Sequence, residues 1–280
     1  MRCSFKTVPQ DTDWASMCDV WLAADDIDVF DCGWNFDHFY PILQHDRTGP
    51  CFEAWTMLAA IAASTDRIRL GAMVTGNPYR HPALLANMAA SVDVISGGRL
   101  ELGLGAGWND EESNAYGIDL PPLRERFDRL DEACVVIDAL LTQEVSNFDG
   151  HYYRLRDARC EPKPLQEPRP PLVIGGGGEK RTLRIAARHA DQWNLAGGSP
   201  EVLAHKLEVL RAHCADVGRD PTEIEASVQV RAQGDPADVA DQAAAMVEAG
   251  AQHVIVGFRA PFHAHDLEPV AHALRKVLPV

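Results

Sequence analysis

The sequence predicts an α/β fold in which eight parallel strands close into a (β/α)8 TIM barrel, with one domain over residues 1–280. Two observations lead to this prediction. Short apolar runs typical of buried strands alternate with amphipathic helical segments along the chain. The length of 280 residues also suits one such barrel. Because ligands bind at the carboxyl ends of the strands in this fold, the segments after each strand become the candidate site.

The first half of the chain is predicted to hold four strand and helix pairs. Asp11 or Asp13 can cap the first helix, and the Ser-Gly-Gly at 96–98 ends the third. A loop with His45, Asp46 and Gly49 follows the second strand. The predicted strands are 2–8, 27–36, 68–74 and 99–105, and the predicted helices are 14–25, 52–64, 82–95 and 123–141.

The second half continues the alternation, with insertions after the fourth strand and before the fifth. Residues 106–117 are long for a simple connection, which favours a functional segment. Residues 145–155 have a hairpin signature, with Asp149 and Gly150 at the turn, and 162–171 are rich in proline. The predicted strands are 172–174, 191–196, 223–230 and 253–258, and the predicted helices are 178–190, 200–217, 236–249 and 266–278.

Composition narrows the class of protein. The net charge of −15 argues against a nucleic-acid binder, which needs a basic surface to neutralise phosphates. We find neither an apolar run long enough to cross a bilayer nor an apolar stretch at the start of the chain that would mark a secretory signal, so we expect no membrane association and a cytoplasmic location. The seven cysteines are scattered without a Cys-x-x-Cys pair, so we expect ordinary thiols and no metal.

Residues 172–194 predict a strand, a glycine turn and a helix in direct succession. The run Gly175 to Gly178 lets the backbone bend sharply and approach a ligand closely. The positive end of the helix that follows, together with Lys180 and Arg181, favours an anion. A run of glycines can also be only a flexible turn, but the strand before it and the helix after it favour the anion site.

The motifs that follow the strands resemble those of the luciferase-like monooxygenase family, in the branch that depends on the deazaflavin coenzyme F420. They span nearly the whole chain in the order of the family. The resembling segments are FDHFYP at 36–41, VTGNPYRHPALLANMAA at 74–90, SGGRLELGLGAGWNDEE at 96–112, ERFDRLDEA at 125–133 and IGGGGEKRTLRIAARHADQWN at 174–194.

The resemblance implies a barrel that binds F420 in its mouth, with the coenzyme phosphate held after the fifth strand. It places Asp37 against the coenzyme and His38 close to its ring, and it implies a cis peptide at Met73–Val74 behind the ring. The residues that the resemblance assigns to coenzyme binding are Asp37, Met73, Val74, Thr75, Gly76, Asn77, Gly105, Ala106, Gly107, Gly175, Gly176, Gly177, Gly178 and Glu179. Trp193, at a strand end, is expected to contact the wall of the coenzyme site, although buried tryptophan is common in any core.

One departure bears on the substrate. Sugar-phosphate dehydrogenases of the family carry a glutamate just after the glycines of the fourth strand, where this chain has Trp108. This difference argues against a phosphosugar and suggests an apolar or aromatic pocket formed by Trp34, Trp108 and Tyr79. Glu111 and Glu112 could still reach the site from their loop, but this acidic run is most simply a solvated loop face.

His38 is the candidate catalytic residue, because an imidazole can accept or donate a proton at neutral pH beside a hydride transfer. An Asp-His pair in a loop can equally brace the fold, so both roles stay open. His81 and His189 lie at helix ends, where caps or core donors are expected.

Three functions follow from the resemblance and the fold. The first is an F420-dependent oxidoreductase that transfers hydride between the coenzyme and a small organic molecule. The second is an FMN-dependent monooxygenase on the same barrel, and the third is a coenzyme carrier without turnover. We also expect a homodimer that packs through the second and third helices, although packing within the barrel explains their apolar faces equally well.

Overall fold

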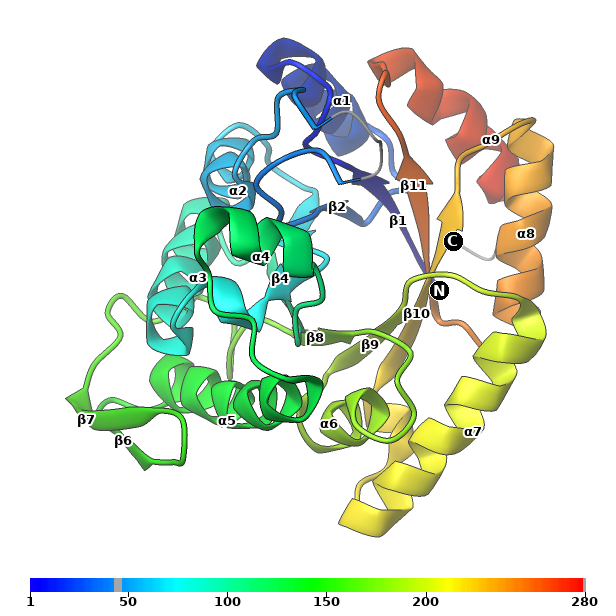
Figure 1. Cartoon of the computed structure of the whole chain (residues 1–280). Helices are drawn as coiled ribbons and strands as arrows, with labels where there is room; N and C mark the ends of the chain where they lie inside the picture. The colour runs from blue at the N-terminus through cyan, green and yellow to red at the C-terminus, as the bar shows by residue number, and fades with distance from the viewer. Residues whose placement is uncertain (43–46, 279–280) are drawn as a thin grey trace.

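The computed structural model describes residues 1–42 and 47–278, so His45 and Asp46 of the predicted loop lie outside the described residues. It confirms the predicted closed barrel of parallel strands (Figure 1). Pairing of β3 with β5 closes the ring, and β4 continues β3 beyond Val74. Around the barrel the strands are β1 (Arg2–Thr7), β2 (Cys32–Asn35), β3 (Arg69–Ala72) with β4 (Thr75–Gly76), β5 (Leu100–Gly105), β8 (Leu172–Gly175), β9 (Gln192–Leu195), β10 (Glu225–Arg231) and β11 (His253–Phe258).

Helices surround the strands (Figure 1), and the main hydrophobic core lies between the two layers. Side-chain caps begin several of these helices. Asp13 caps α1, as predicted, and His81 caps α3 through its Nδ1 atom. The helices are α1 (Trp14–Asp26), α2 (Ala54–Ala62), α3 (Pro82–Ser96), α4 (Asp110–Tyr116), α5 (Leu123–Thr142), α6 (Thr182–His189), α7 (Pro200–Val217), α8 (Pro236–Glu248) and α9 (Leu267–Val277), with 3-10 turns η1 (Asn77–Tyr79), η2 (Pro221–Glu223) and η3 (Ala264–Asp266).

Three predicted boundaries were wrong. The strand predicted to begin at Ile27 begins at Cys32, because the amide of Phe30 bonds to the carbonyl of Ile27 and forms a turn there. The helix predicted from Gly178 begins at Thr182, after the glycines. Part of the long segment after β5 is helical, and Asn109 caps this α4 helix by accepting the amide of Glu112.

The predicted hairpin is present, as β6 (Ser146–Asp149) and β7 (Arg154–Ala158). Its turn is wider than the expected Asp149-Gly150 pair, because the carboxylate of Glu132 accepts three successive turn amides at 2.8–3.1 Å. The hairpin lies at the periphery of the barrel, beside α5 (Figure 1).

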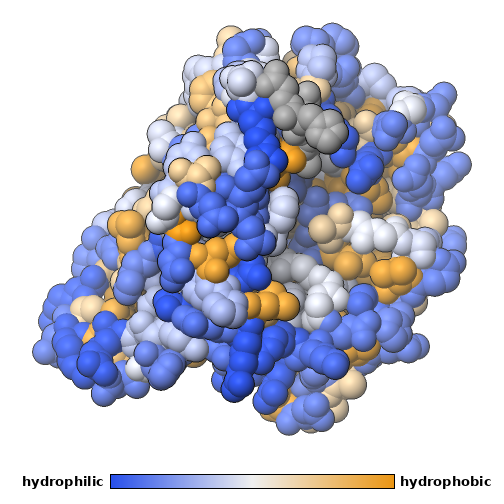
Figure 2. Space-filling view, in the orientation of Figure 1, coloured by the Kyte–Doolittle hydropathy of each residue, from blue (hydrophilic) through white to orange (hydrophobic). Residues whose placement is uncertain are grey.

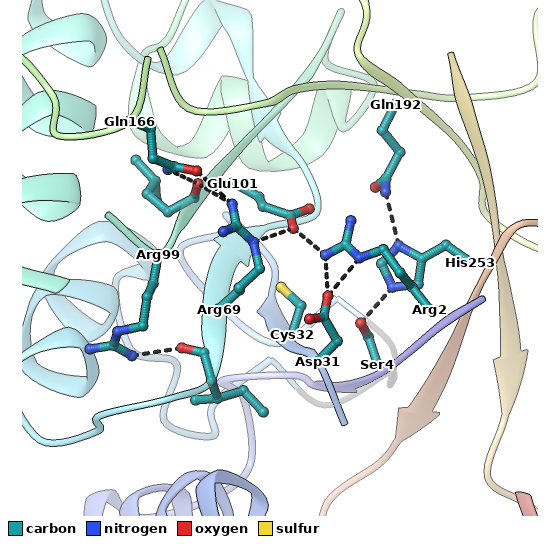
Figure 3. A network of polar contacts seen from close by, with 12 residues as sticks. Arg2, Ser4, Asp31, Cys32, Arg69, Arg99, Glu101, Gln166, Gln192 and His253 are labelled. Atoms are coloured by element: carbon teal, nitrogen blue, oxygen red, sulfur yellow. Dashed lines mark hydrogen bonds and ion pairs between the residues drawn. The ribbon is translucent and has the colours of Figure 1, made fainter. Parts of the chain in front are cut away.

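A network of partly buried ion pairs lies at the amino end of the barrel (Figure 3). Arg2 of β1 donates to Asp31 at 2.6 Å and to Glu225 at 2.8 Å, and it also pairs with the buried Glu101. Arg69 of β3 donates to the same Glu101 at 2.8 Å. Paired charges occupy this end, whereas a ligand-sized cavity lined by described residues lies at the opposite end, where the strands terminate.

Two further predictions concern membrane association and dimer formation. No helix in the described part of the chain is long and apolar enough to cross a membrane. The face of α2 and α3 holds a shallow groove of about 330 Å³ lined by residues such as Trp55 and Ile95. Ile95 is 49% exposed. Dimerisation through this face stays a prediction.

Candidate active site at the carboxyl end of the barrel

A cavity of about 1000 Å³ opens at the carboxyl ends of the strands. This face of the molecule is hollowed near its centre, and hydrophobic and hydrophilic atoms both reach the edge of the hollow (Figure 2). The 37–38, 105–107 and 175–176 segments, far apart in sequence, all line this one cavity, which could hold a large coenzyme. Of the predicted site residues, the lining includes Asp37, His38, Met73, Val74, Gly76, Gly105, Ala106, Gly107, Trp108, Gly175 and Gly176.

His38 is held in place by the buried carboxylate of Glu112. The Nδ1 atom of His38 lies 2.6 Å from Glu112 Oε2, and the hydroxyl of Tyr79 donates to the same oxygen at 2.6 Å. The amide of Phe39 donates to the other oxygen at 2.7 Å. Burial alone would raise the pKa of Glu112, but these hydrogen bonds outweigh it and lower the pKa, so Glu112 is a carboxylate at neutral pH.

The interpretation of Glu112 as part of a solvated loop face was therefore wrong. Its side chain is 0% exposed, whereas the neighbouring Glu111 is 64% exposed. The reason is the α4 helix, whose first turn directs Glu112 inward beneath His38. The pattern Asn109-x-x-Glu112 is the signature of a helix amino terminus, and it could have indicated this helix from the sequence.

Asp37 forms a bidentate ion pair with Arg80, a residue that sequence reasoning did not single out. Two Arg80 nitrogens lie 2.5 and 3.1 Å from the Asp37 carboxylate, and Arg80 also pairs with Glu53. Burial raises the pKa of Asp37, while the Arg80 charge opposes the rise. The Asp37 charge is thus matched inside the protein rather than left for a ligand.

The peptide between Met73 and Val74 is cis, as the resemblance implied. Val74 projects between two neighbouring strand ends that consist of glycine. A Cβ atom on Gly105 would lie 2.7 Å from Val74 Cγ2, and one on Gly175 would lie 2.8 Å from Val74 Cγ1. Glycine at both positions therefore lets Val74 reach this depth, and together they form a backbone-lined wall of the cavity.

The glycine segment after β8 approaches the cavity only through its first residues. Gly175 and Gly176 line it, and Gly176 has φ of +122°, which favours glycine. Arg181, one of the two predicted basic residues, pairs with Asp128 of α5, and Arg188 of α6 pairs with Asp131 of the same α5 helix. Further backbone after β9, at Gly197 and Gly198, lines the same side of the cavity and was not predicted.

Several predicted residues do not line the cavity. Trp34 packs inside the barrel with Met73 and Val173 and is 0% exposed. The ring nitrogen of Trp193 donates to the carbonyl of Gly176 at 2.8 Å, so this residue supports the glycine turn from behind. Glu179 pairs with Lys206 at 2.6 Å. The predicted residues outside the lining are Trp34, Thr75, Asn77, Gly177, Gly178, Glu179 and Trp193.

Trp108 stands at the mouth of the cavity beside His38. The two ring centroids are 5.6 Å apart in an edge-on arrangement, and Trp108 is 63% exposed. An indole left this open next to a candidate proton donor offers a surface for the apolar part of a ligand. The prediction that Trp108 contacts substrate is compatible with this position.

Three cations also line the cavity and were not predicted. Lys6 of β1 lies at its floor, and Nζ donates to the carbonyl of Met73 and to Gln229, each at 3.1 Å. Burial lowers the pKa of Lys6 to about 8. Arg231, at the end of β10, and Arg259, directly after β11, lie at the rim. Among the described residues, no cluster of histidine, cysteine and carboxylate side chains is suited to a metal ion.

Comparison with known proteins establishes the family. The profile of the luciferase-like monooxygenase family matches residues 33–276, so the chain belongs to this family. An F420-dependent hydroxymycolic acid dehydrogenase of Mycobacterium tuberculosis is 36% identical over 192 residues, which cover 68% of this chain and 51% of that protein. An F420-dependent glucose-6-phosphate dehydrogenase of Kineococcus radiotolerans is 33% identical over 204 residues, covering 72% of this chain and 59% of that protein.

A solved structure supports the fold. The F420-dependent secondary alcohol dehydrogenase in complex with an F420-acetone adduct superposes with a TM-score of 0.88 at 18% identity, covering 99% of both chains. The chain spans only about half to three fifths of the two dehydrogenases named above.

Proposed function

We propose that the protein is an oxidoreductase that uses coenzyme F420 to transfer hydride to or from a small organic substrate. One observation carries the proposal: His38, braced by the buried Glu112, lines the same cavity as the backbone wall around Val74. The F420-dependent relatives support the choice of coenzyme.

The residues present fit such a coenzyme. The wall of Val74, Gly105 and Gly175 offers a flat ring a surface without protruding polar side chains. The amino end of α6 has no side-chain cap, which leaves amide groups near Gly176 for a phosphate. The backbone at Gly197 and Gly198 would contact the coenzyme on the same side.

When bound, the deazaflavin supplies a carbon that accepts or gives a hydride. The protein's part is to align the substrate and to move its proton. Because Glu112 holds the Nδ1 atom of His38, the Nε2 atom is the one left to exchange a proton with the substrate. Trp108 would cover the apolar part of the substrate beside this imidazole.

Titration of the purified protein with F420 and, in parallel, with FMN tests the choice of coenzyme through quenching of their fluorescence. We expect saturable binding of F420 and binding of FMN that is weaker by about a hundredfold or more. Tight FMN binding without F420 binding would instead favour the FMN-dependent monooxygenase.

A substrate screen with oxidised and reduced F420, followed by the visible absorbance of the coenzyme, then tests for turnover. Replacement His38→Ala should abolish most of any turnover found while the coenzyme still binds. A protein that binds F420 but converts no substrate in the screen would be a carrier.

A further inference from the structure

We propose that Lys6, Arg231 and Arg259 bind an anionic group, a carboxylate or a phosphate, of the substrate. The inference rests on the proposed function, since it names the class of substrate that this cavity accepts. It departs from the purely apolar or aromatic pocket that Trp108 suggested.

The strand register places two of these cations on either side of one gap. Lys6 of β1 and Arg231 of β10 are both paired with Gly257 of β11 between them. Paired residues of neighbouring parallel strands point to the same face, and all three line the cavity. Two strand spacings of about 4.8 Å separate the backbones of Lys6 and Arg231, which is within reach of two long side chains that hold one anion.

Gly257 leaves this gap open. A Cβ atom added there would meet only the carbonyl of Val230, at 3.5 Å, which is an ordinary contact. The backbone of Gly257 also lies outside the left-handed region, so its conformation does not require glycine. The missing side chain therefore leaves free space between a cation at the floor and a cation at the rim.

The three positive charges are not neutralised by the protein. In the described part of the chain, none of them forms an ion pair, whereas Arg80 on the other side of the cavity binds Asp37 and Glu53. Asp37, already bound to Arg80, is the single carboxylate among the described lining residues. Lys6 uses two of its three donors, so one N–H remains for a ligand.

An excess of positive charge inside a chain of net charge −15 needs an explanation. Elsewhere in the described chain most arginines pair with carboxylates, and unpaired cations in a concave site attract anions. The rest of the lining is partly apolar, at Val8, Trp108, Phe127, Met246 and Phe258. The cavity thus suits a molecule with one charged end and an apolar body.

The experiment is calorimetric titration of the coenzyme-saturated protein with hexanoate, hexyl phosphate and, as the uncharged comparison, hexan-1-ol. We expect at least one anion to bind about tenfold or more tightly than hexan-1-ol. Arg231→Gln and Arg259→Gln should each weaken anion binding about tenfold and leave hexan-1-ol binding unchanged.

A matched control and a neutral variant sharpen the test. Arg211→Gln removes an exposed arginine of α7 that has no ion pair with any described residue and lies outside the cavity lining, and it should leave anion affinity unchanged. Gly257→Val fills the gap without altering any charge, and it should weaken anion binding about as much as the loss of one arginine.

The proposal is overturned if the anions bind no more tightly than hexan-1-ol, or if Arg211→Gln reduces anion affinity as much as Arg231→Gln does. It is also overturned if Arg231→Gln and Arg259→Gln weaken F420 binding instead, because the cations would then serve the coenzyme. If FMN rather than F420 saturates the protein, the choice of coenzyme fails, whereas the same titrations on the FMN-loaded protein still decide the anion site.

Discussion

The two halves of the cavity are built on different principles. The half after β2, β4, β5 and β8, which we call the coenzyme half, presents glycine backbone, Val74 and the Asp37–Arg80 pair. The half formed by β10, β11 and β1, which we call the cationic half, presents Lys6 and two rim arginines without counter-ions in the described structure.

The difference indicates what each half can select. Charges in the coenzyme half are matched within the protein, so that half recognises a ligand mainly by shape and by hydrogen bonds to backbone. Charges in the cationic half are unmatched, so that half recognises a ligand by its charge. This division suits an enzyme that binds its coenzyme through shape and backbone hydrogen bonds and selects its substrate by charge.

The largest effect should come from removing a matched cation. Arg80 is 10% exposed and binds the fully buried carboxylate of Asp37, so Arg80→Gln leaves an uncompensated buried charge. We expect the free energy of unfolding to fall by about 3–5 kcal/mol, as for other broken buried pairs. Urea denaturation at pH 7 measures the change.

The corresponding change in the cationic half is the control. Arg231→Gln removes an exposed cation with no ion pair in the described structure, and it should change the free energy of unfolding by no more than about 0.5 kcal/mol. Equal losses in the two variants would show that the halves do not differ in how their charges are matched.

The next effect concerns His38, the residue proposed to transfer the substrate's proton, and its partner Glu112. Glu112→Gln keeps the volume of the side chain but removes the negative charge that positions His38. With a substrate from the screen, we expect turnover to fall about a hundredfold while F420 affinity is nearly unchanged, since positioned proton transfer contributes at least this much.

A split between kcat and KM separates positioning from simple damage to the fold. In Glu112→Gln we expect kcat to fall while KM stays near its wild-type value, because the change misplaces the imidazole of His38 without removing a contact to the substrate. Glu111→Gln, a change at the exposed adjacent residue, should leave both constants as they are. A Glu112→Gln enzyme whose kcat per folded molecule is unchanged would limit Glu112 to a structural role.

The fold was predictable from the sequence because its signals are local. Alternating strand and helix patterns gave all eight barrel strands, although β2 is shorter than predicted. The α4 helix was missed because only seven residues form it and acidic side chains fill its first turn. Its local signals were the caps at its two ends, Asn109 and Gly117.

The site was predictable only in part, because its partners are distant in sequence. Motifs after the strands gave Asp37, His38 and most of the glycines that the structure brings to one cavity, whereas Gly177 and Gly178 lie outside its lining. Arg80 and Lys6 were missed and Glu112 was not favoured, since the role of each depends on contacts between residues far apart in sequence rather than on local spacing. Trp34 and Trp193 were predicted to contact ligands. Side chains alternate between the two faces of a strand, and the Trp34 side chain lies inside the barrel while that of Trp193 lies between the strands and the helices.

The smallest predicted effect is a pH dependence at the floor of the cationic half. Burial lowers the pKa of Lys6 from 10.5 to about 8 in the folded protein. Between about pH 8 and pH 10.5 Lys6 is protonated in the unfolded chain but largely neutral in the folded protein. The free energy of unfolding of the wild type therefore increases as the pH rises through this range. Relative to Lys6→Met, the wild type should gain about 1–2 kcal/mol between pH 7 and pH 10, because water in the open cavity reduces the full effect.

Urea denaturation of both proteins at pH 7, 8.5 and 10 measures this gain. Lys6→Met also removes the hydrogen bonds to Met73 and Gln229, which lowers the free energy of unfolding by a similar amount at each pH. The test therefore uses only the change with pH of the difference in free energy of unfolding between the two proteins. For Lys180→Met, a change at an exposed position, the free energy of unfolding should vary with pH in the same way as that of the wild type. A difference between wild type and Lys6→Met that stays constant from pH 7 to pH 10 would mean that the Lys6 charge is fully hydrated. The floor of the cationic half would then carry a hydrated lysine rather than one that is partly withdrawn from water.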